Sequence, residues 1–358
     1  METVLDLIGS GLAARGHELW SVAASRGGDS AADGTAEGGA RVIRCRSLAT
    51  VASQPVSPSL PGVLKRVLRE ARPEIVTLHW PNPLAALALR WARRELPRDS
   101  RLTVWYHADI TRQKLGAVLL RPLLSGLLDR ADGIAVSTAS LRDESTQLAG
   151  RGDRVEVIPF GIDTTDWDLP SHPGEGPFLF VGRLVYYKGL ELLLDAMADV
   201  PDARLEIVGD GPLRDRLRAR AEDPALRGRV RLHGELDDAD LREVMSRCGA
   251  LVLPSLRRSE TFGLVQIEAM AAGLPVISTQ LPTGVAEVNV HGRTGLLVPP
   301  GNRAALAGAL RDVMRDPARA RDWGDAGRAR ARDRFSHERM VDALERWYVA
   351  LLGGEAGV

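Results

Sequence analysis

Cysteine and long apolar runs are scarce in this chain of 358 residues. Its two cysteines, Cys45 and Cys248, lie far apart and outside any histidine–cysteine metal spacing, so neither a disulfide framework nor a zinc site is expected. No apolar run approaches the roughly 18 residues that span a bilayer. The first twenty residues lack a basic region followed by an apolar stretch, so no signal peptide is expected. These absences favour a cytoplasmic chain without a membrane-spanning helix.

An excess of either charge is also absent. Lys+Arg 47 balance Asp+Glu 47, and this formal net charge of +0 predicts no nucleic acid partner. Lysine is rare among the basic residues, because only Lys65, Lys114 and Lys188 occur. Arginine is therefore the ordinary cation of this chain. A lysine at a candidate site suggests a need for a compact point charge.

The apolar residues predict an α/β fold. Short runs of valine, isoleucine and leucine alternate with helical segments, a pattern typical of parallel sheets covered by helices. The expected strands cover residues 41–46, 75–79, 102–106, 133–136 and 155–158 in the first half, and 178–181, 204–208, 230–232, 250–253, 275–278 and 295–298 in the second. Helices are expected to begin near Pro61, Pro83, Lys114 and Leu141.

The length predicts two domains, because single cores rarely grow beyond about 250–300 residues. A linker is expected in "VIPFGIDTTDWDLPSHPGEGP", which is rich in proline and glycine. We therefore assign residues 1–160 to an N-terminal domain and residues 161–335 to a C-terminal domain. Two segments of the first domain are expected to be surface loops, Ser25 to Ala40 and "ASQPVSPSLPG".

The strongest chemical pattern is "SETFGLVQIEAMAAG", residues 259–273, directly after the apolar strand "ALVLPS". A strand followed by a loop and a helix directs free backbone N–H groups at a ligand above the sheet, and a diphosphate suits them. Glu260 precedes this helix and Glu268 lies inside it, where carboxylates can accept hydrogen bonds from sugar hydroxyls. In the alternative interpretation Glu260 is a cap residue and Glu268 a solvated helix residue. The small, apolar flanks favour the first interpretation, because a buried carboxylate needs partners.

A second pattern, "FLFVGRLVYYKG", places Arg183 and Lys188 after a strand. Two cations at the carboxyl end of a strand can hold a pyrophosphate and neutralise a leaving group. The alternative is a pair of exposed basic residues.

Two weaker patterns complete the set. In "RLEIVGDGPLRDRL" the residues Gly209, Asp210 and Gly211 form a tight turn where the backbone can approach a ligand. In "LTVWYHADI" residue His107 ends a strand, at the edge where open parallel sheets present ligands. His79 in "LHWPNP" is similar, and its loop is interpreted as facing an acceptor. A single histidine is, however, more often structural.

These segments resemble the retaining glycosyltransferases of family 4, which have the GT-B fold of two Rossmann-like domains facing across a cleft. The segment from Glu260 to Glu268 is similar to their Glu-x7-Glu signature, and "GRLVYYKG" to their Gly-Arg-Leu-x-x-x-Lys-Gly motif. The resemblance implies catalytic roles for His107, Arg183, Lys188 and Glu260, and donor contacts from Gly209, Asp210, Gly211, Gly234, Leu236, Thr261, Phe262, Gly263, Leu264 and Glu268. It implies no metal and no cofactor.

The same resemblance implies the reaction. A hexose would pass with retention from a GDP- or UDP-linked sugar to a glycan or lipid-linked acceptor, in cell-surface polysaccharide biosynthesis, as in mannosyl- and rhamnosyltransferases. The helix at residues 336–352 would return onto the first domain. The basic helix at residues 112–130, with Arg112, Lys114 and Arg121, could rest peripherally on the inner face of an anionic membrane. A core helix with a basic cap is the alternative.

One departure concerns the start of the chain. Family members begin with a strand and a glycine-rich loop, whereas this sequence starts at the helix "VLDLIGSGLAARGHEL". Either the sequence is expected to start at an internal methionine, or the first strand of the N-terminal domain is expected to be missing. The alternative function is therefore a non-catalytic nucleotide-sugar-binding protein or a truncated inactive paralogue. The "GSGLAARG" stretch is expected to be a helix that ends at Gly16, not a dinucleotide loop. "DDAD", residues 237–240, is expected to cap a helix and not to bind a metal.

Overall fold

The computed structural model describes residues 2–24, 33–35, 39–51, 54–109 and 125–354. The chain divides into two compact units, and each is described here by itself. The N-terminal unit comprises Met1–Pro159 together with His337–Val358, and the C-terminal unit comprises Phe160–Ser336.

The strands of the N-terminal unit form small sheets. The largest has the parallel order β6-β7-β8-β9, with β6 (Ile75–Trp80), β7 (Arg101–Tyr106), β8 (Gly133–Val136) and β9 (Val155–Val157). A second has the order β1-β3-β2, with β1 (Trp20–Ala24), β2 (Asp33–Thr35) and β3 (Arg41–Cys45), and β4 (Ala49–Val51) pairs with β5 (Gln54–Val56). Within the described ranges no strand joins β1 to β6, and the first element is the helix α1.

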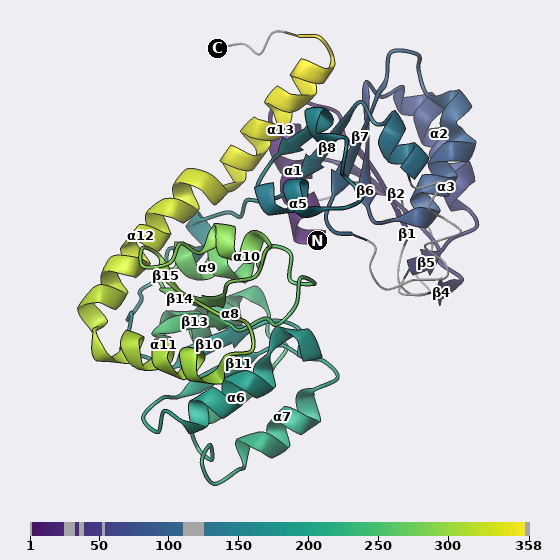
Figure 1. Cartoon of the computed structure of the whole chain (residues 1–358). Helices are drawn as coiled ribbons and strands as arrows, with labels where there is room; N and C mark the ends of the chain where they lie inside the picture. The colour runs from purple at the N-terminus through teal and green to yellow at the C-terminus, as the bar shows by residue number, and fades with distance from the viewer. Residues whose placement is uncertain (1, 25–32, 36–38, 52–53, 110–124, 355–358) are drawn as a thin grey trace. The chain divides into compact units, whose positions relative to one another are not determined.

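Helices cover both faces of the β6–β9 sheet (Figure 1). They are α1 (Glu2–Ala14), α2 (Leu60–Ala71), α3 (Pro83–Ala92), α5 (Ala139–Glu144) and α13 (His337–Leu351), with short 3-10 turns η1 (Arg93–Glu95) and η2 (Gly152–Arg154). On one face, α13 packs through Tyr348, whose hydroxyl lies 2.7 Å from that of Thr77 on β6. On the other, Ala86 and Leu89 of α3 join the core around Trp80.

The C-terminal unit contains a six-stranded parallel sheet with the order β12-β11-β10-β13-β14-β15. Its strands are β10 (Phe178–Val181), β11 (Leu205–Val208), β12 (Val230–Gly234), β13 (Ala250–Leu253), β14 (Val276–Thr279) and β15 (Gly295–Val298). Its helices are α6 (Leu190–Ala198), α7 (Arg214–Ala221), α8 (Asp238–Ser246), α9 (Val265–Ala271), α10 (Gly284–Val288), α11 (Arg303–Arg315) and α12 (Pro317–Phe335), with 3-10 turns η3 (Thr165–Trp167) and η4 (Tyr186–Lys188).

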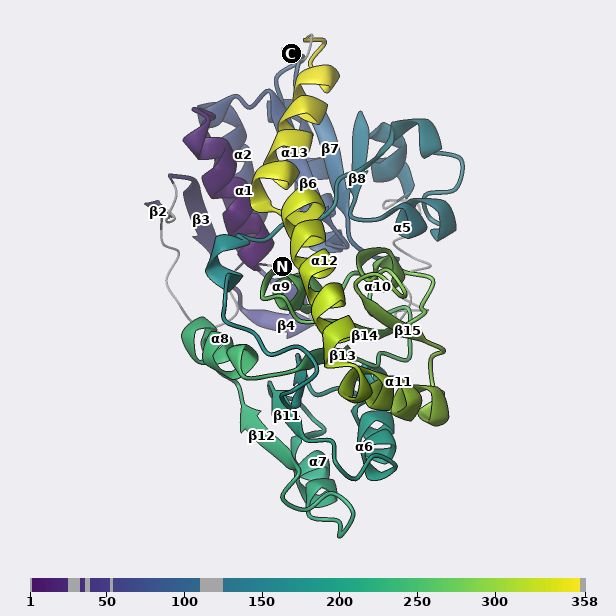
Figure 2. The same cartoon turned by 90° about the vertical axis from the view of Figure 1, so that its left-hand side faces the viewer.

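Successive side chains of each strand point to opposite faces of this sheet, and apolar side chains on both faces bury it on both sides. Phe178 and Phe180 of β10 join a core with α6, α7 and α11, whereas Leu179 between them is fully buried toward the opposite face. Figure 2 shows α8 on one side of the sheet and α6 with α11 on the other. All six strands end at one edge of the sheet, so the loops that follow them gather there.

The α/β fold class is confirmed, and each expected strand is present within two residues of its predicted bounds. Two expected loops were wrong in part. The stretch from Ser25 to Ala40 contains β2, and "ASQPVSPSLPG" contains β5 and the start of α2. Both strands are three residues long and pair through the backbone, so side-chain composition gives little sign of them. Lys114, near which a helix was expected to begin, lies outside the described residues.

The "GSGLAARG" and "DDAD" stretches have structural roles. Residues 9–14 of the first stretch belong to α1, which ends at Ala14, two residues before the predicted end at Gly16, and Gly16 takes a positive φ of 88°. Asp237 caps α8, because its carboxylate accepts a hydrogen bond of 2.9 Å from the backbone N–H of Asp240.

Candidate active site

A buried ion pair lies at the carboxyl edge of the C-terminal sheet. Lys188 ends η4 after β10, and Glu260 lies in the loop after β13, the strand next to β10. The Lys188 Nζ atom is 2.5 Å from Glu260 Oε2, and these side chains are only 11% and 10% exposed. The Ser255 hydroxyl donates a 3.1 Å hydrogen bond to the same oxygen. The sequence placed both residues at strand ends, and the structure brings them into contact.

The two loops are fixed against each other around this pair. The backbone N–H of Leu256 donates a 2.7 Å hydrogen bond to the carbonyl of Tyr187, and Thr279 Oγ1 donates one of 2.6 Å to the carbonyl of Ser255. Gly189 has a positive φ of 72°, and a Cβ atom there would lie 2.1 Å from the carbonyl oxygen of Pro254. The glycine after Lys188 therefore allows the loops to touch, which holds the ammonium and the carboxylate in place.

Arg183 lies in the same loop as Lys188 but does not share the pair. Its side chain is exposed, and within the described part of the chain it makes no ion pair. It is thus a cation directed at solvent near the edge of the sheet, available to an anion that binds there.

The Gly209–Gly211 turn has a structural reason for its glycines. A Cβ atom at Gly209 would lie 2.2 Å from the carbonyl oxygen of Gly182, and one at Gly211 would lie 2.6 Å from that of Leu184. The carboxylate of Asp210 accepts hydrogen bonds of 2.6 Å from the N–H of Gly211 and from Arg214. These glycines let the loops after β10 and β11 meet, so their presence alone is no sign of a ligand.

Gly234 is the last residue of β12 and Leu236 follows the strand, beside that turn. The carbonyl of Gly234 accepts a 2.6 Å hydrogen bond from the N–H of Gly209. Gly234 has a positive φ of 79° with open space around it, and Leu236 is half-buried. His233 Nε2 contacts the carboxylate of Glu206 on β11. The predicted nucleotide surroundings thus form one continuous edge from β10 to β12.

The segment before α9 combines a buried aromatic ring with half-buried neighbours. The Phe262 ring is buried edge-on against Phe160, with ring centroids 5.1 Å apart. Gly263 has a φ of 74°, whereas Thr261 and Leu264 are half-buried. The aromatic ring fixes the position of the backbone that the sequence analysis assigned to sugar and phosphates.

Glu268 lies on α9, where burial raises the pKa of its carboxyl group to about 7, with a smaller effect from Asp238. Its side chain keeps some exposure, yet the protein around it disfavours the charged form. Near neutral pH the group is therefore close to its point of half-protonation.

Replacing Glu268 by glutamine tests this effect. The folded-state pKa lies above the ordinary glutamate value of 4.5, so the stability from the neutral form is present below about pH 4.5 and lost as pH rises through 7. Glutamine mimics the neutral acid at every pH. We expect Glu268→Gln to raise the free energy of unfolding by about 1–3 kcal/mol at about pH 8.5 and by little at about pH 5. Urea unfolding at both pH values measures it, with exposed Glu243→Gln as control. Equal effects at both pH values would contradict the assignment.

His107, the remaining candidate, belongs to the N-terminal unit, where it pairs with His79. His107 Nε2 lies 3.0 Å from His79 Nδ1, and both rings stack near Trp105. Burial lowers the pKa of His79 to about 4, and burial with the nearby His79 lowers that of His107 to about 3. Both rings are neutral at pH 7, so one ring nitrogen donates to the other. The catalytic role that the resemblance implies for His107 stays a prediction.

Two hydroxyl residues were missed by the sequence analysis. Ser255 binds Glu260 directly, and Thr283 follows β14, where the N–H of the next residue, Gly284, donates a 2.8 Å hydrogen bond to the carbonyl of Thr261. Among the described residues, the buried Thr283 hydroxyl has no hydrogen-bond partner. Both residues follow the end of a strand, a position that could have identified them.

Neither a metal site nor a membrane span is found in the described ranges. No group of three or more His, Cys, Asp or Glu residues there could hold a metal ion. No helix in that part of the chain is long and apolar enough to cross a bilayer.

Comparisons with known proteins agree with this architecture. Residues 1–166 match the family described as Glycosyltransferase Family 4, and residues 162–330 match Glycosyl transferases group 1. D-rhamnosyltransferase WbpZ of Pseudomonas aeruginosa is 36% identical over 308 residues, which cover 84% of this chain and 79% of the relative. O-antigen chain mannosyltransferase C of Escherichia coli is 32% identical over 320 residues, which cover 87% and 84%.

Solved structures share the fold. Sucrose-phosphate synthase from Thermosynechococcus elongatus superposes with a TM-score of 0.78 at 24% identity, covering 97% of this chain and 92% of that one. HepE of Anabaena, in complex with UDP and glucose, gives 0.72 at 20% identity, covering 92% and 99%. The fold is thus that of the GT-B class. The chain belongs to glycosyltransferase family 4, the group 1 glycosyl transferases.

Proposed function

We propose that this chain is a retaining, metal-independent hexosyltransferase that uses a nucleotide diphosphate sugar as donor. The buried Lys188–Glu260 pair carries the proposal, because it places an ammonium and a carboxylate together at the ligand-binding edge of a parallel sheet. An ammonium suits a diphosphate, and a carboxylate suits the hydroxyls of a sugar. A molecule that carries a diphosphate next to sugar hydroxyls can therefore bind both residues of the pair.

In this proposal residues 161–335 form the donor domain. Lys188 and the exposed Arg183 neutralise the departing diphosphate, and Glu260 accepts hydrogen bonds from the sugar. The backbone around Gly263, from Thr261 to Leu264, meets sugar and phosphate. Glu268 accepts hydrogen bonds from the ribose, while the turns at Gly209–Gly211 and at Gly234–Leu236 surround the nucleotide.

Residues 1–160, with the returning helix at 336–352, form the acceptor domain. His107 touches the donor sugar near the reaction centre, and its neutral ring offers a hydrogen bond there without adding a charge. The acceptor hydroxyl attacks from the face that the diphosphate leaves, so the anomeric configuration is retained. We assign no covalent nucleophile.

The relatives support a choice of donor and acceptor. The rhamnosyl- and mannosyltransferase relatives favour a GDP-linked donor, and the UDP complex of HepE keeps a UDP-linked donor open. The O-antigen relative favours a glycan or lipid-linked acceptor in cell-surface polysaccharide assembly. We place the protein in the cytoplasm, with residues 112–130 in peripheral contact with the membrane. Most of that segment lies outside the described residues.

A ligand screen followed by product analysis tests the function. GDP, UDP and their mannose and glucose conjugates are added separately, and the matching ligand is expected to raise the unfolding free energy by about 2.7 kcal/mol at 100 times its Kd. Proton NMR of the transfer product should then show the anomeric configuration of the donor. An inverted product contradicts retention. Binding without transfer, even with an upstream-extended chain, would favour the non-catalytic binding protein.

A further inference from the structure

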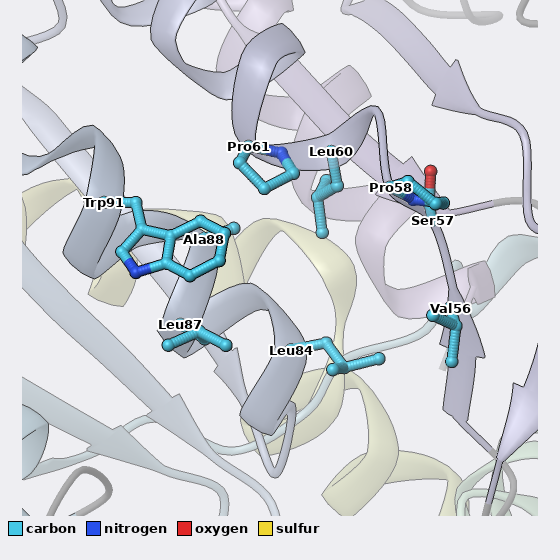
Figure 3. A pocket seen from close by; sticks show the side chains of 9 residues that line it. All are labelled: Val56, Ser57, Pro58, Leu60, Pro61, Leu84, Leu87, Ala88 and Trp91. Carbon is cyan, nitrogen blue, oxygen red and sulfur yellow. The ribbon is translucent and has the colours of Figure 1, made fainter.

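An apolar groove opens on the α2–α3 face of the N-terminal unit. It encloses about 280 Å³ and is lined almost entirely by apolar side chains, among them Leu60 and Pro61 of α2 and Leu84, Leu87 and Trp91 of α3. Figure 3 shows Trp91 at one end of the groove, with both helices contributing to its walls. None of these residues belongs to the proposed transfer site.

The residues of α3 explain why the groove faces outward. Ala86 and Leu89 point to the core of the unit, so Leu84, Leu87 and Trp91, spaced by three and four residues, form a second apolar stripe. Trp91 is 58% exposed although it is a large aromatic residue. Two apolar stripes are expected on a helix whose two sides are both covered by other groups. In α3, however, the side with Trp91 is open to solvent.

The segment of the chain that forms this groove is rich in basic residues. Residues 60–98 hold eight Lys and Arg residues against three Glu, although the whole chain has no net charge. Of the acids, Glu95 is already paired with Arg69 at 2.7 Å. Arg90 and Arg94, one residue before and three residues after Trp91 in the sequence, are exposed and, within the described residues, make no ion pair. An apolar groove with an exposed tryptophan and a cationic border is complementary to an amphiphile with a negative head.

We propose that this groove binds an anionic membrane phospholipid, with part of one acyl chain between α2 and α3 and its phosphate against Arg90 and Arg94. Trp91 then lies at the level of the headgroups, where indole rings are favoured because one end is apolar and the other polar. A purely apolar peptide would fill the groove but would gain nothing from the cations. The proposal does not depend on glycosyl transfer, because it concerns attachment to the membrane surface.

Vesicle flotation tests the charge requirement. The full chain is mixed with vesicles of phosphatidylcholine alone or with added phosphatidylglycerol, and only the anionic vesicles are expected to carry it. Arg90→Glu with Arg94→Glu should lower the partition coefficient at least tenfold. Arg218→Glu with Arg315→Glu makes the same change of charge at exposed positions of the C-terminal unit and is the matched control. Equal loss in both double variants, equal binding to neutral vesicles or no binding at all would overturn the proposal.

A second measurement locates the contact. Vesicles whose acyl chains carry bromine should quench the tryptophan fluorescence of the wild-type chain, since bromine quenches only at short range. Trp91→Phe should still float with anionic vesicles but lose most of this quenching. Unchanged quenching in Trp91→Phe would place the lipid elsewhere. Donor binding, followed by thermal shift, should stay unchanged in the Arg90 and Arg94 variants, which separates this proposal from the transfer site.

Discussion

Glu260→Gln is expected to lower kcat/KM for sugar transfer by about 10²–10³-fold, the usual effect of removing one fixed polar group from a reaction centre. The carboxylate is held by Lys188 and Ser255 before any substrate arrives, so its charge is already in place. Glutamine keeps the size of the side chain and one carbonyl oxygen but not the negative charge. Steady-state transfer with saturating acceptor measures the effect.

Stability must be followed in parallel, because Glu260→Gln leaves Lys188 buried without a carboxylate. Removing one partner of a buried pair costs about 3 kcal/mol or more, and the hydrogen bonds of glutamine should keep the loss below that. The exposed Glu243→Gln is the control for the same chemical change. Transfer at the wild-type rate by a folded Glu260→Gln variant would remove Glu260 from the site.

Gly209→Ala is expected to destabilise the C-terminal unit by about 3 kcal/mol or more. Gly209 has a φ of 123°, and its added Cβ atom would lie 2.2 Å from the carbonyl oxygen of Gly182. The contacting atom belongs to the backbone and cannot change rotamer as a side chain can, so the loops after β10 and β11 would have to separate. The melting temperature should fall by about 2–4 °C for each kcal/mol.

Gly228→Ala is the matched control for this steric argument. Gly228 also has a positive φ, 74°, but nothing lies within 4 Å of its Cβ position. Alanine there meets only backbone strain, which costs about 1 kcal/mol. Similar losses of stability in the two variants would show that strain, and not the contact with Gly182, decides the effect at Gly209.

The sequence predicted those parts of the fold that depend on side-chain pattern. The strands Phe178–Val181 and Ala250–Leu253 are apolar along their whole length and were predicted at their observed bounds. The strand Trp20–Ala24 was missed, because "WSVAA" is short and only partly apolar, and its burial alternates between half-buried and exposed. Strand Asp33–Thr35 exists through pairing with β3 and has no apolar residue to mark it.

The sequence identified the residues of the candidate site but not which of them touch one another. Lys188 and Glu260 are far apart in sequence, and their contact follows from the strand order that makes β10 the neighbour of β13. That order depends on how helices pack on the sheet, which single motifs do not encode. The contact between His79 and His107 arises in the same way from adjacent β6 and β7. Gly209 was assigned to a ligand, whereas the contact with Gly182 already requires a glycine.

The ion pair at Lys188 and Glu260 has a consequence for selectivity. In the pair the ammonium and the carboxylate neutralise each other, so a ligand of either group competes with the other member of the pair. A lone phosphate would pair with the ammonium but leave the buried carboxylate without a partner. A neutral sugar would hydrogen-bond to the carboxylate but leave the ammonium without a partner. In the proposed donor site, a molecule that joins an anion to a set of sugar hydroxyls would replace both partners at once, so the pair would favour the whole nucleotide sugar over a lone phosphate or a free sugar.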